Sequence, residues 1–197
     1  MASAAEDRSW ISPEEYYRIE RDAVEKSDWY RGEMFNMAGG TTNHSRIKTN
    51  LLAALALSLK GKPCEPLDSD QRVKSVATGL RFYPDASVFC ERIAYDDEEP
   101  FKETTINPGA VFEVLSDSTE AYDRGLRAEC LRRIESLRAY AFLSQHAPHV
   151  ELYERQDDGS WRFSEVSGPG GEVEIRSIDV VLSLAEIYDR VEFRDAE

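Results

Sequence analysis

Two stretches of the sequence decide the fold: Tyr-Pro-Asp-Ala-Ser-Val-Phe-Cys at residues 83–90 and Ala-Val-Phe-Glu-Val-Leu at residues 110–115. Each is typical of a buried β-strand, yet each carries one carboxylate, Asp85 in the first and Glu113 in the second. A carboxylate is rarely fully buried unless it is paired or bound to a metal, because its charge loses the stabilisation that water gives. If the two strands are neighbours, Asp85 and Glu113 therefore indicate a shared cation.

The composition bounds the class of protein. With 197 residues, of which 41% are hydrophobic, the chain can bury one substantial core, and we expect a single domain over residues 10–197. Residues 1–9 are small and charged and are expected to form a disordered lead-in. The sequence has no apolar run of about 18 residues and no apolar N-terminal stretch, which predicts a cytoplasmic protein without a membrane partner.

The cysteines and the charge balance narrow the class further. Cys64, Cys90 and Cys130 are widely spaced and odd in number, so we expect small buried side chains rather than a disulfide scaffold or a zinc site. The 38 acidic and 24 basic residues give a formal net charge of −14, which disfavours non-specific binding of polyanions. A local basic patch or a bound divalent cation could still recruit a phosphodiester. The regional basic excess consists of Arg46, Lys48, Lys60, Lys62, Arg72 and Lys74.

Capping residues and hydrophobic periodicity predict the order of the elements. Helices are expected at about 13–24, 42–59, 124–135 and 184–191. Strands are expected on both sides of an Arg-Gly turn within residues 28–37, at about 64–68, 70–76, 80–83, 85–90, 110–115 and 139–143, and as a hairpin over residues 150–166. The acidic residues 96–99 are predicted to lie in a solvated loop. This mixture of helices and strands predicts one α/β domain.

The carboxylates suggest a metal site. A metal-dependent phosphodiesterase needs two or three carboxylates around Mg²⁺ or Mn²⁺, with open positions for water and a phosphate oxygen. Asp85 and Glu113 meet this requirement if their strands are neighbours, Glu33 is a third candidate, and Asp70 is a weaker fourth. The alternatives stay open: Asp85 shapes a turn after proline, Glu33 is an exposed hairpin residue, and Asp70 belongs to an ordinary turn.

Four motifs resemble one known family. They are a Gly-Glu hairpin at Glu33, a helix with an early histidine at His44, the Pro-Asp strand at Asp85, and Glu-Val-Leu-Ser-x-Ser-Thr followed by Tyr-Asp-Arg-Gly over residues 113–125. Together they resemble the Uma family of restriction-endonuclease-like proteins in the PD-(D/E)XK nuclease superfamily. The resemblance covers residues 12–191, and residues 113–125 are its most specific part.

The resemblance implies a restriction-endonuclease-like core, an α+β fold in which helices flank a mixed central β-sheet. It also implies that Asp85 and Glu113 hold Mg²⁺ or Mn²⁺ with Glu33 as an additional acidic ligand, and that nucleic acid, DNA in particular, is the substrate. The superfamily pattern places a lysine two residues after the glutamate, where this chain has Leu115. In relatives that resemble this chain the lysine lies in the next helix, in Asp-Arg-Gly-x-Lys, and the matching residue here is Arg127.

Arg127 and His44 complete the candidate site. Arginine stays charged, so Arg127 can stabilise charge or orient water but, unlike lysine, cannot give up a proton. At about 100° per residue, Arg127 falls in the same arc as the apolar residues of its helix, and we expect it to point toward the sheet with a functional or carboxylate-pairing role. His44 begins the apolar stripe of the second helix and is either a structural histidine bonded to the backbone or a residue that binds phosphate or orients water.

Two functions compete. The favoured one is a divalent-metal-dependent endonuclease that hydrolyses phosphodiester bonds of nucleic acid, with Asp85, Glu113, Arg127 and His44 as catalytic residues. The alternative is a catalytically degenerate nuclease-fold protein that acts as a binding or regulatory module, which Leu115, Arg127 and the net charge favour. A third possible function, a metal-independent hydrolase of the glycosidase type, has less support, because only the acidic pair points to it. The exposed edges of a small mixed sheet also predict a homodimer.

Overall fold

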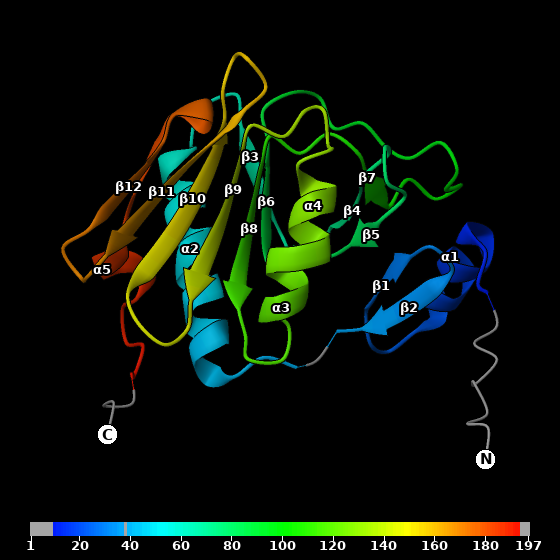
Figure 1. The fold of residues 1–197 in the computed structure, drawn as a ribbon, viewed down its shortest axis with the longest axis horizontal. Coiled ribbons are helices and arrows are strands. Elements are labelled where there is room, and N and C mark those ends of the chain that lie inside the picture. The colour runs from blue at the N-terminus through cyan, green and yellow to red at the C-terminus, as the bar shows by residue number, and fades with distance from the viewer. Residues whose placement is uncertain (1–9, 38, 194–197) are drawn as a thin grey trace.

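A mixed six-stranded sheet forms the centre of the computed structural model, which describes residues 10–37 and 39–193 (Figure 1). Its strand order is β11-β10-β9-β8-β6-β3. The strands are β3 (Glu65–Asp68), β6 (Ala86–Phe89), β8 (Ala110–Leu115), β9 (Ala139–Ser144), β10 (His149–Arg155) and β11 (Trp161–Ser167). β8 and β9 run parallel and the other neighbours run antiparallel. The predicted mixed central sheet is therefore confirmed.

A smaller five-stranded sheet lies beside the central one, with the order β2-β1-β5-β4-β7. Its strands are β1 (Ser27–Tyr30), β2 (Glu33–Asn36), β4 (Arg72–Lys74), β5 (Arg81–Phe82) and β7 (Thr104–Thr105). Helix α1 (Pro13–Asp22) contributes Tyr16 and Tyr17 to a small core with Trp29 of β1. The residues Tyr83, Pro84 and Asp85 join β5 of this sheet to β6 of the central sheet. The Pro-Asp motif is thus one of the connections between the two sheets.

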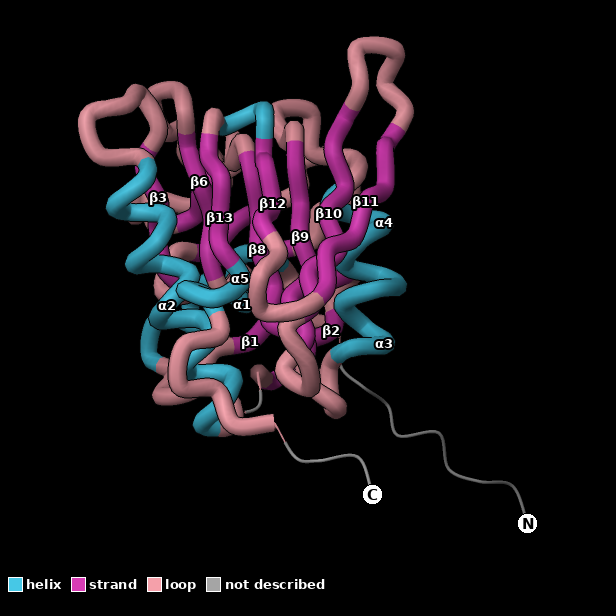
Figure 2. The backbone as a smooth tube through the Cα atoms, turned by 90° about the vertical axis from the view of Figure 1, so that its left-hand side faces the viewer, coloured by secondary structure: helices cyan, strands magenta, loops and turns pink. Residues whose placement is uncertain are grey.

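Helices cover both faces of the central sheet, as Figure 2 shows from the side. Helix α2 (Thr42–Ser58) packs on one face together with the hairpin of β12 (Glu172–Ile175) and β13 (Val180–Ser183) and with α5 (Leu184–Ile187). The other face carries α3 (Glu120–Tyr122), a π-helical turn (Asp123–Arg127) and α4 (Ala128–Leu131). No helix in the described ranges has the length and apolar character to cross a membrane.

The alternation of β8 decides which way Glu113 points. Phe112 and Val114 belong to the hydrophobic core under α2, whereas Val111 and Leu115 belong to the core under α4. Because successive side chains of a strand point to opposite faces, Glu113 shares the α4 face with Leu115. The side chain that replaces the superfamily lysine is thus packed among apolar groups, and Leu115 is only 5% exposed.

The predicted lead-in over residues 1–9 lies outside the described residues. Other sequence-based expectations need correction. The acidic loop is not solvated throughout, because Asp96 and Glu99 are buried against Lys74 and Arg72. Here two buried basic side chains of β4 require carboxylate partners, and the loop supplies them. The short strands β7, β12 and β13 were not predicted.

The cysteine expectation is wrong for two of the three residues. Cys64 and Cys90 form a disulfide. In the antiparallel pair of β3 and β6, Glu65 lies opposite Phe89, so the next pair outward is Cys64 with Cys90. Because the two cysteines are 26 residues apart in the sequence, the sequence alone does not indicate that they are in contact. Cys130 is a buried free thiol, as expected.

We expect reduction of this disulfide to lower the free energy of unfolding by about 2 to 3 kcal/mol, because the bond restricts the unfolded chain by closing a loop. Urea unfolding with and without a phosphine reductant measures the difference. In Cys90→Ser the reductant should change nothing. An equal response of the variant would show that the effect does not come from the Cys64–Cys90 bond and would contradict the prediction.

Candidate active site

The register of β6 and β8 brings the two predicted carboxylates together. Ala86 pairs with Phe112 in the antiparallel ladder, so the next position outward places Asp85 opposite Glu113. The backbone N–H of Val114 donates a hydrogen bond of 2.8 Å to Asp85 Oδ2, which holds this carboxylate beside the strand of Glu113. The prediction that the two strands are neighbours is confirmed.

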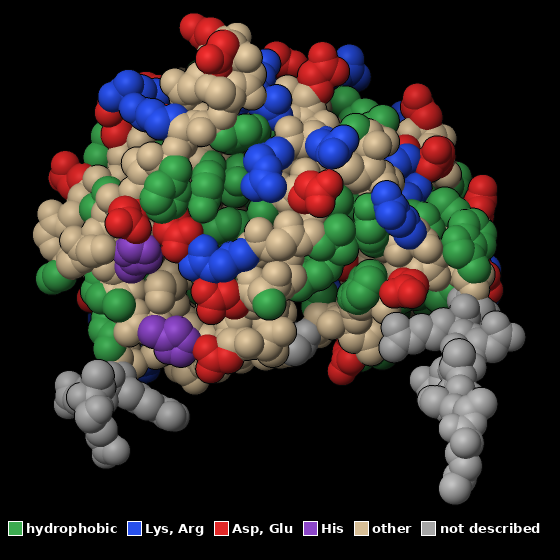
Figure 3. Space-filling model, viewed as in Figure 1, with side chains coloured by type: hydrophobic (Ala, Val, Ile, Leu, Met, Phe, Trp, Pro, Cys, Tyr) green, Lys and Arg blue, Asp and Glu red, His purple; other side chains and the backbone are tan. Residues whose placement is uncertain are grey.

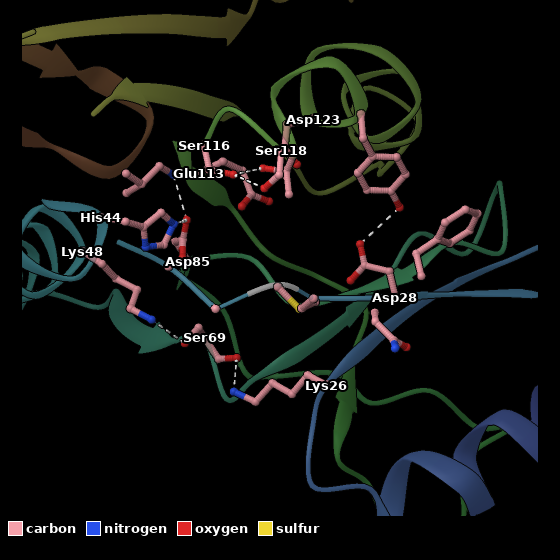
Figure 4. Close-up of a pocket in the computed structure, with 18 of the residues that line it drawn as sticks. Lys26, Asp28, His44, Lys48, Ser69, Asp85, Glu113, Ser116, Ser118 and Asp123 are labelled. Carbon is pink, nitrogen blue, oxygen red and sulfur yellow. Dashed lines mark hydrogen bonds and ion pairs between the residues drawn. The ribbon is translucent and has the colours of Figure 1, made fainter. Parts of the chain in front are cut away.

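A cavity of about 560 Å³ opens beside this pair, where the two sheets meet. Its walls come from the end of β8 and the following loop, the beginning of α2, strands β1 and β2, and the turn between β3 and β4. Figure 4 shows Asp85 and Glu113 close together on one side, with His44 next to Asp85 and Asp28 on another side. Asp28 belongs to the small sheet and Glu113 to the central sheet, so both sheets contribute acid groups to one cavity.

Arg127 connects the carboxylates of three different elements. Its Nη2 donates a hydrogen bond to Asp28 Oδ2, and its Nη1 lies 3.0 Å from Glu113 Oε1 and 2.9 Å from Asp123 Oδ1. These two Nη1 contacts lack hydrogen-bond geometry, so Glu113 Oε1 and Asp123 Oδ1 are buried without a hydrogen-bond partner. Arg127 itself is 5% exposed. The expected direction of Arg127 toward the sheet is confirmed.

Burial dominates the electrostatics of this cluster. It raises the pKa of Glu113 well above the usual value, and the nearby charge of Arg127 only partly opposes this. Burial also raises the pKa of Asp123. For Arg127, burial acts to lower the pKa, but the surrounding carboxylates of Asp28, Glu113 and Asp123 outweigh it and raise the pKa. One guanidinium is thus shared among three carboxylates, and burial disfavours the charged forms of Glu113 and Asp123.

His44 meets Asp85 from the beginning of α2. Its Nε2 lies 3.2 Å from Asp85 Oδ2, and both side chains are mostly buried. The side chain of Thr41 caps the helix by accepting from the backbone N–H of His44. A Cβ atom on Gly40 would lie 2.8 Å from His44 Nδ1, so the glycine leaves room for the ring. The side chain of His44 is therefore directed at a carboxylate of the candidate site.

Two other sequence candidates lie apart from this cluster. Glu33 begins β2, where it is exposed and pairs with Tyr30, and it does not line the cavity. The cavity is lined instead by Phe35, Asn36 and Met37 at the other end of β2. Asp70 lies on the exposed turn between β3 and β4 and contacts Lys26. The hydrogen bond and charge of Lys26 lower the pKa of Asp70.

Sequence reasoning missed two acids of the cluster. Asp28 is 1% exposed, and its Oδ1 accepts from the backbone N–H of Tyr83 while its Oδ2 accepts from the hydroxyl of Tyr122. Asp123 directly precedes the helix expected at about 124–135, a position typical of an exposed helix cap, but it is buried beside Arg127. The spacing of four residues between Asp123 and Arg127, on a face already expected to meet the sheet, was the available signal. No comparable pattern marked Asp28, because an aspartate near the beginning of a strand is common and is usually explained by the preceding turn.

Comparisons with known proteins give a consistent result. A sequence model of the Uma2 family, described as "Putative restriction endonuclease", matches residues 13–185. The uncharacterized protein slr1290 of Synechocystis is 34% identical over 185 residues, which cover 93% of this chain and 94% of that relative. The uncharacterized protein sll1609 of the same organism is 32% identical over 164 residues, covering 83% and 92%.

The fold has a counterpart among solved structures. The crystal structure of a "putative nuclease belonging to DUF820" from Anabaena variabilis matches with a TM-score of 0.72 and 17% sequence identity, over 91% of this chain and 98% of that chain. This likeness confirms the predicted restriction-endonuclease-like fold. Because the family pattern also spans most of the sequence, from α1 to α5, the chain belongs to the Uma2 family.

Proposed function

We propose that this protein hydrolyses phosphodiester bonds of nucleic acid with a divalent metal ion held by Asp85 and Glu113. The observation that carries the proposal is the pair itself: two carboxylates opposite each other on neighbouring strands, at the wall of a cavity large enough for a nucleotide unit. Water would attack phosphorus, the bond from phosphorus to the leaving oxygen would break, and the products would be an alcohol and a phosphate monoester.

The donor set fits Mg²⁺ or Mn²⁺. These ions prefer oxygen ligands, and Mg²⁺ is commonly bound by one or two carboxylates while water and substrate phosphate fill the other positions. Within the described residues, no group of three or more His, Cys, Asp or Glu side chains is arranged to hold a metal ion, so the proposed site relies on the two carboxylates, with water and substrate at the other positions. The buried Glu113 Oε1, which has no hydrogen-bond partner, favours a cation as its ligand. When bound, it would activate water and neutralise charge on the phosphate oxygens.

The other residues hold the pair in place. Val114 and His44 both contact Oδ2 of Asp85, which leaves Oδ1 available as a ligand. Arg127 orients Glu113 and Asp28, and its fixed positive charge stabilises the negative charge that develops on a phosphate in the transition state. It does not accept a proton from water, because guanidinium stays protonated.

One observation favours a second candidate, a nuclease fold that binds without cleaving. The position of the superfamily lysine is filled by Leu115 in the core, and Arg127 is committed to buried carboxylates. At these two positions the site lacks the lysine that could exchange a proton with the attacking water.

The metal site is tested by calorimetric titration of Mn²⁺ into the wild type and into Glu113→Gln, which keeps the volume and removes the charge. We expect stoichiometric binding by the wild type and an affinity at least about tenfold lower in Glu113→Gln, since losing one of two anionic ligands weakens a hard-cation site.

Glu33→Gln is the matched control, because it removes the same charge outside the cavity and should bind Mn²⁺ like the wild type. A wild type that binds no Mn²⁺ would overturn the proposed metal dependence. Binding without any cleavage of DNA or RNA in the same buffer would favour the second candidate.

A further inference from the structure

Two lysines converge on one turn at the side of the cavity away from Asp85. The ammonium group of Lys26 donates 2.8 Å to the backbone oxygen of Ser69, and that of Lys48 donates 3.2 Å to its hydroxyl. Lys26, Lys48 and Ser69 all line the same cavity as Asp85 and Glu113. In Figure 4 the two lysines reach Ser69 from different sides, below the group formed by His44 and Asp85.

The fold places these lysines relative to the acid groups. Lys48 follows His44 by four residues on α2, so the two side chains lie on the same face of the helix, one turn apart. His44 contacts Asp85 while Lys48 contacts the turn between β3 and β4. Lys26 precedes β1, which carries Asp28, and it lies 5.4 Å from the ring centre of Tyr83 beside the Pro-Asp motif. Both lysines are thus built on elements that also position the acid groups.

These lysines are available to an anion from solvent. The carboxylate that contacts Lys26 belongs to Asp70, whose side chain is 81% exposed, and exposed ion pairs of this kind contribute little free energy and exchange readily. Lys48 donates to a neutral hydroxyl. Arg127, the third cation at the cavity, is instead bound to buried carboxylates.

Other residues of the predicted basic excess are not placed to bind an anion in this cavity. Arg72 and Lys74 are buried against Glu99 and Asp96, and neither they nor Lys60 line the cavity. On the face shown in Figure 3, basic side chains form small separate groups with acidic side chains between them. In a chain with a net charge of −14, local cations inside the cavity would help to attract a polyanion to this site.

We propose that Lys26 and Lys48 form a subsite for a phosphate adjacent to the scissile one, so that the cavity selects a polynucleotide backbone over a small isolated phosphodiester. The phosphate would replace Asp70 on Lys26 and Ser69 on Lys48. This inference rests on the proposed function for the scissile position, but the binding of the second phosphate does not depend on catalysis.

The test measures binding of a short fluorescein-labelled DNA duplex by anisotropy at several KCl concentrations, with Ca²⁺ in place of Mn²⁺. Each phosphate contact that a lysine makes contributes nearly one unit to the slope of log affinity against log salt. We expect Lys26→Gln and Lys48→Gln each to reduce the magnitude of the slope by about one and to weaken binding roughly tenfold at low salt. Lys60→Gln, an exposed lysine just after α2, is the control and should match the wild type.

A second readout separates this subsite from the scissile position. Hydrolysis of bis(p-nitrophenyl) phosphate with Mn²⁺ should be the same in the wild type and both lysine variants, because this substrate has no second phosphate, while KM for the duplex should rise. Salt slopes equal to that of the wild type, or a wild type that does not bind the duplex, would overturn the subsite. A wild type that binds no Mn²⁺ in the calorimetric test would overturn the metal site, and the salt slopes would then decide the subsite alone.

Discussion

Replacing Arg127 with methionine is expected to lower the free energy of unfolding by about 3 to 5 kcal/mol, the usual cost of leaving buried charges without a partner. Asp28, Glu113 and Asp123 are each no more than 3% exposed, and Arg127 is the cation that contacts all three. Methionine fills a similar volume, so loss of packing contributes little to the difference. Equilibrium unfolding in urea near neutral pH measures it.

Arg124→Met is the matched control on the same helical segment. Arg124 pairs with Glu120 and donates two hydrogen bonds to Glu151, but its side chain is 37% exposed and water can take its place, so we expect a smaller loss of about 1 to 2 kcal/mol. Equal losses in the two variants would show that burial of the Arg127 cluster has no special energetic role. Addition of Mn²⁺ should recover part of the stability of Arg127→Met, since binding to the native state stabilises it.

Replacing Arg127 with lysine is expected to raise Mn²⁺-dependent cleavage of a DNA duplex by about 10²-fold, the lower end of what a positioned proton-transfer group contributes. Lysine keeps the positive charge next to Glu113 and can share a proton with water, whereas arginine cannot. Single-turnover cleavage rates at saturating protein measure the chemical step without a contribution from product release.

The outcome distinguishes the two candidate functions. A wild type with no detectable cleavage and an active Arg127→Lys would mean that the chain has lost activity at this one position. Unchanged or lower cleavage in Arg127→Lys, with an active wild type, would contradict the expected gain and assign Arg127 a purely positioning role. Arg127→Gln, which removes the charge but keeps polar groups, controls for simple loosening of the cluster.

The sequence predicted the central part of the fold and the acidic pair. Asp85 and Glu113 could be predicted because a carboxylate in an otherwise apolar strand is physically costly and therefore informative. The direction of Arg127 could be predicted because helical periodicity survives the π-helical turn well enough to keep it on the inner face. Both inferences depend on local pattern, which a single sequence carries.

The remaining features depend on which strands meet, and a single sequence does not carry this information. Asp28 joins the site because β1 pairs with β5, whose next residues form the Pro-Asp connection. The disulfide depends on the register of β3 and β6, and the burial of Asp96 depends on Lys74 of a different element. The predicted homodimer stays a prediction.

The acid cluster also joins the two sheets. Asp28 comes from the small sheet, Glu113 from the central sheet, and Arg127 holds both through one guanidinium. Val73 of β4 and Phe82 of β5 belong to an apolar core of the central sheet, whereas α1 and β1 share only a small core, so α1, β1 and β2 can open locally while the central sheet persists. Such opening would take Asp28 and Lys26 away from Asp85 and Glu113 together. The chain can therefore stay folded while its candidate site is disassembled. The site is complete only when the less stable part, which carries Asp28 and Lys26, is docked on the central sheet.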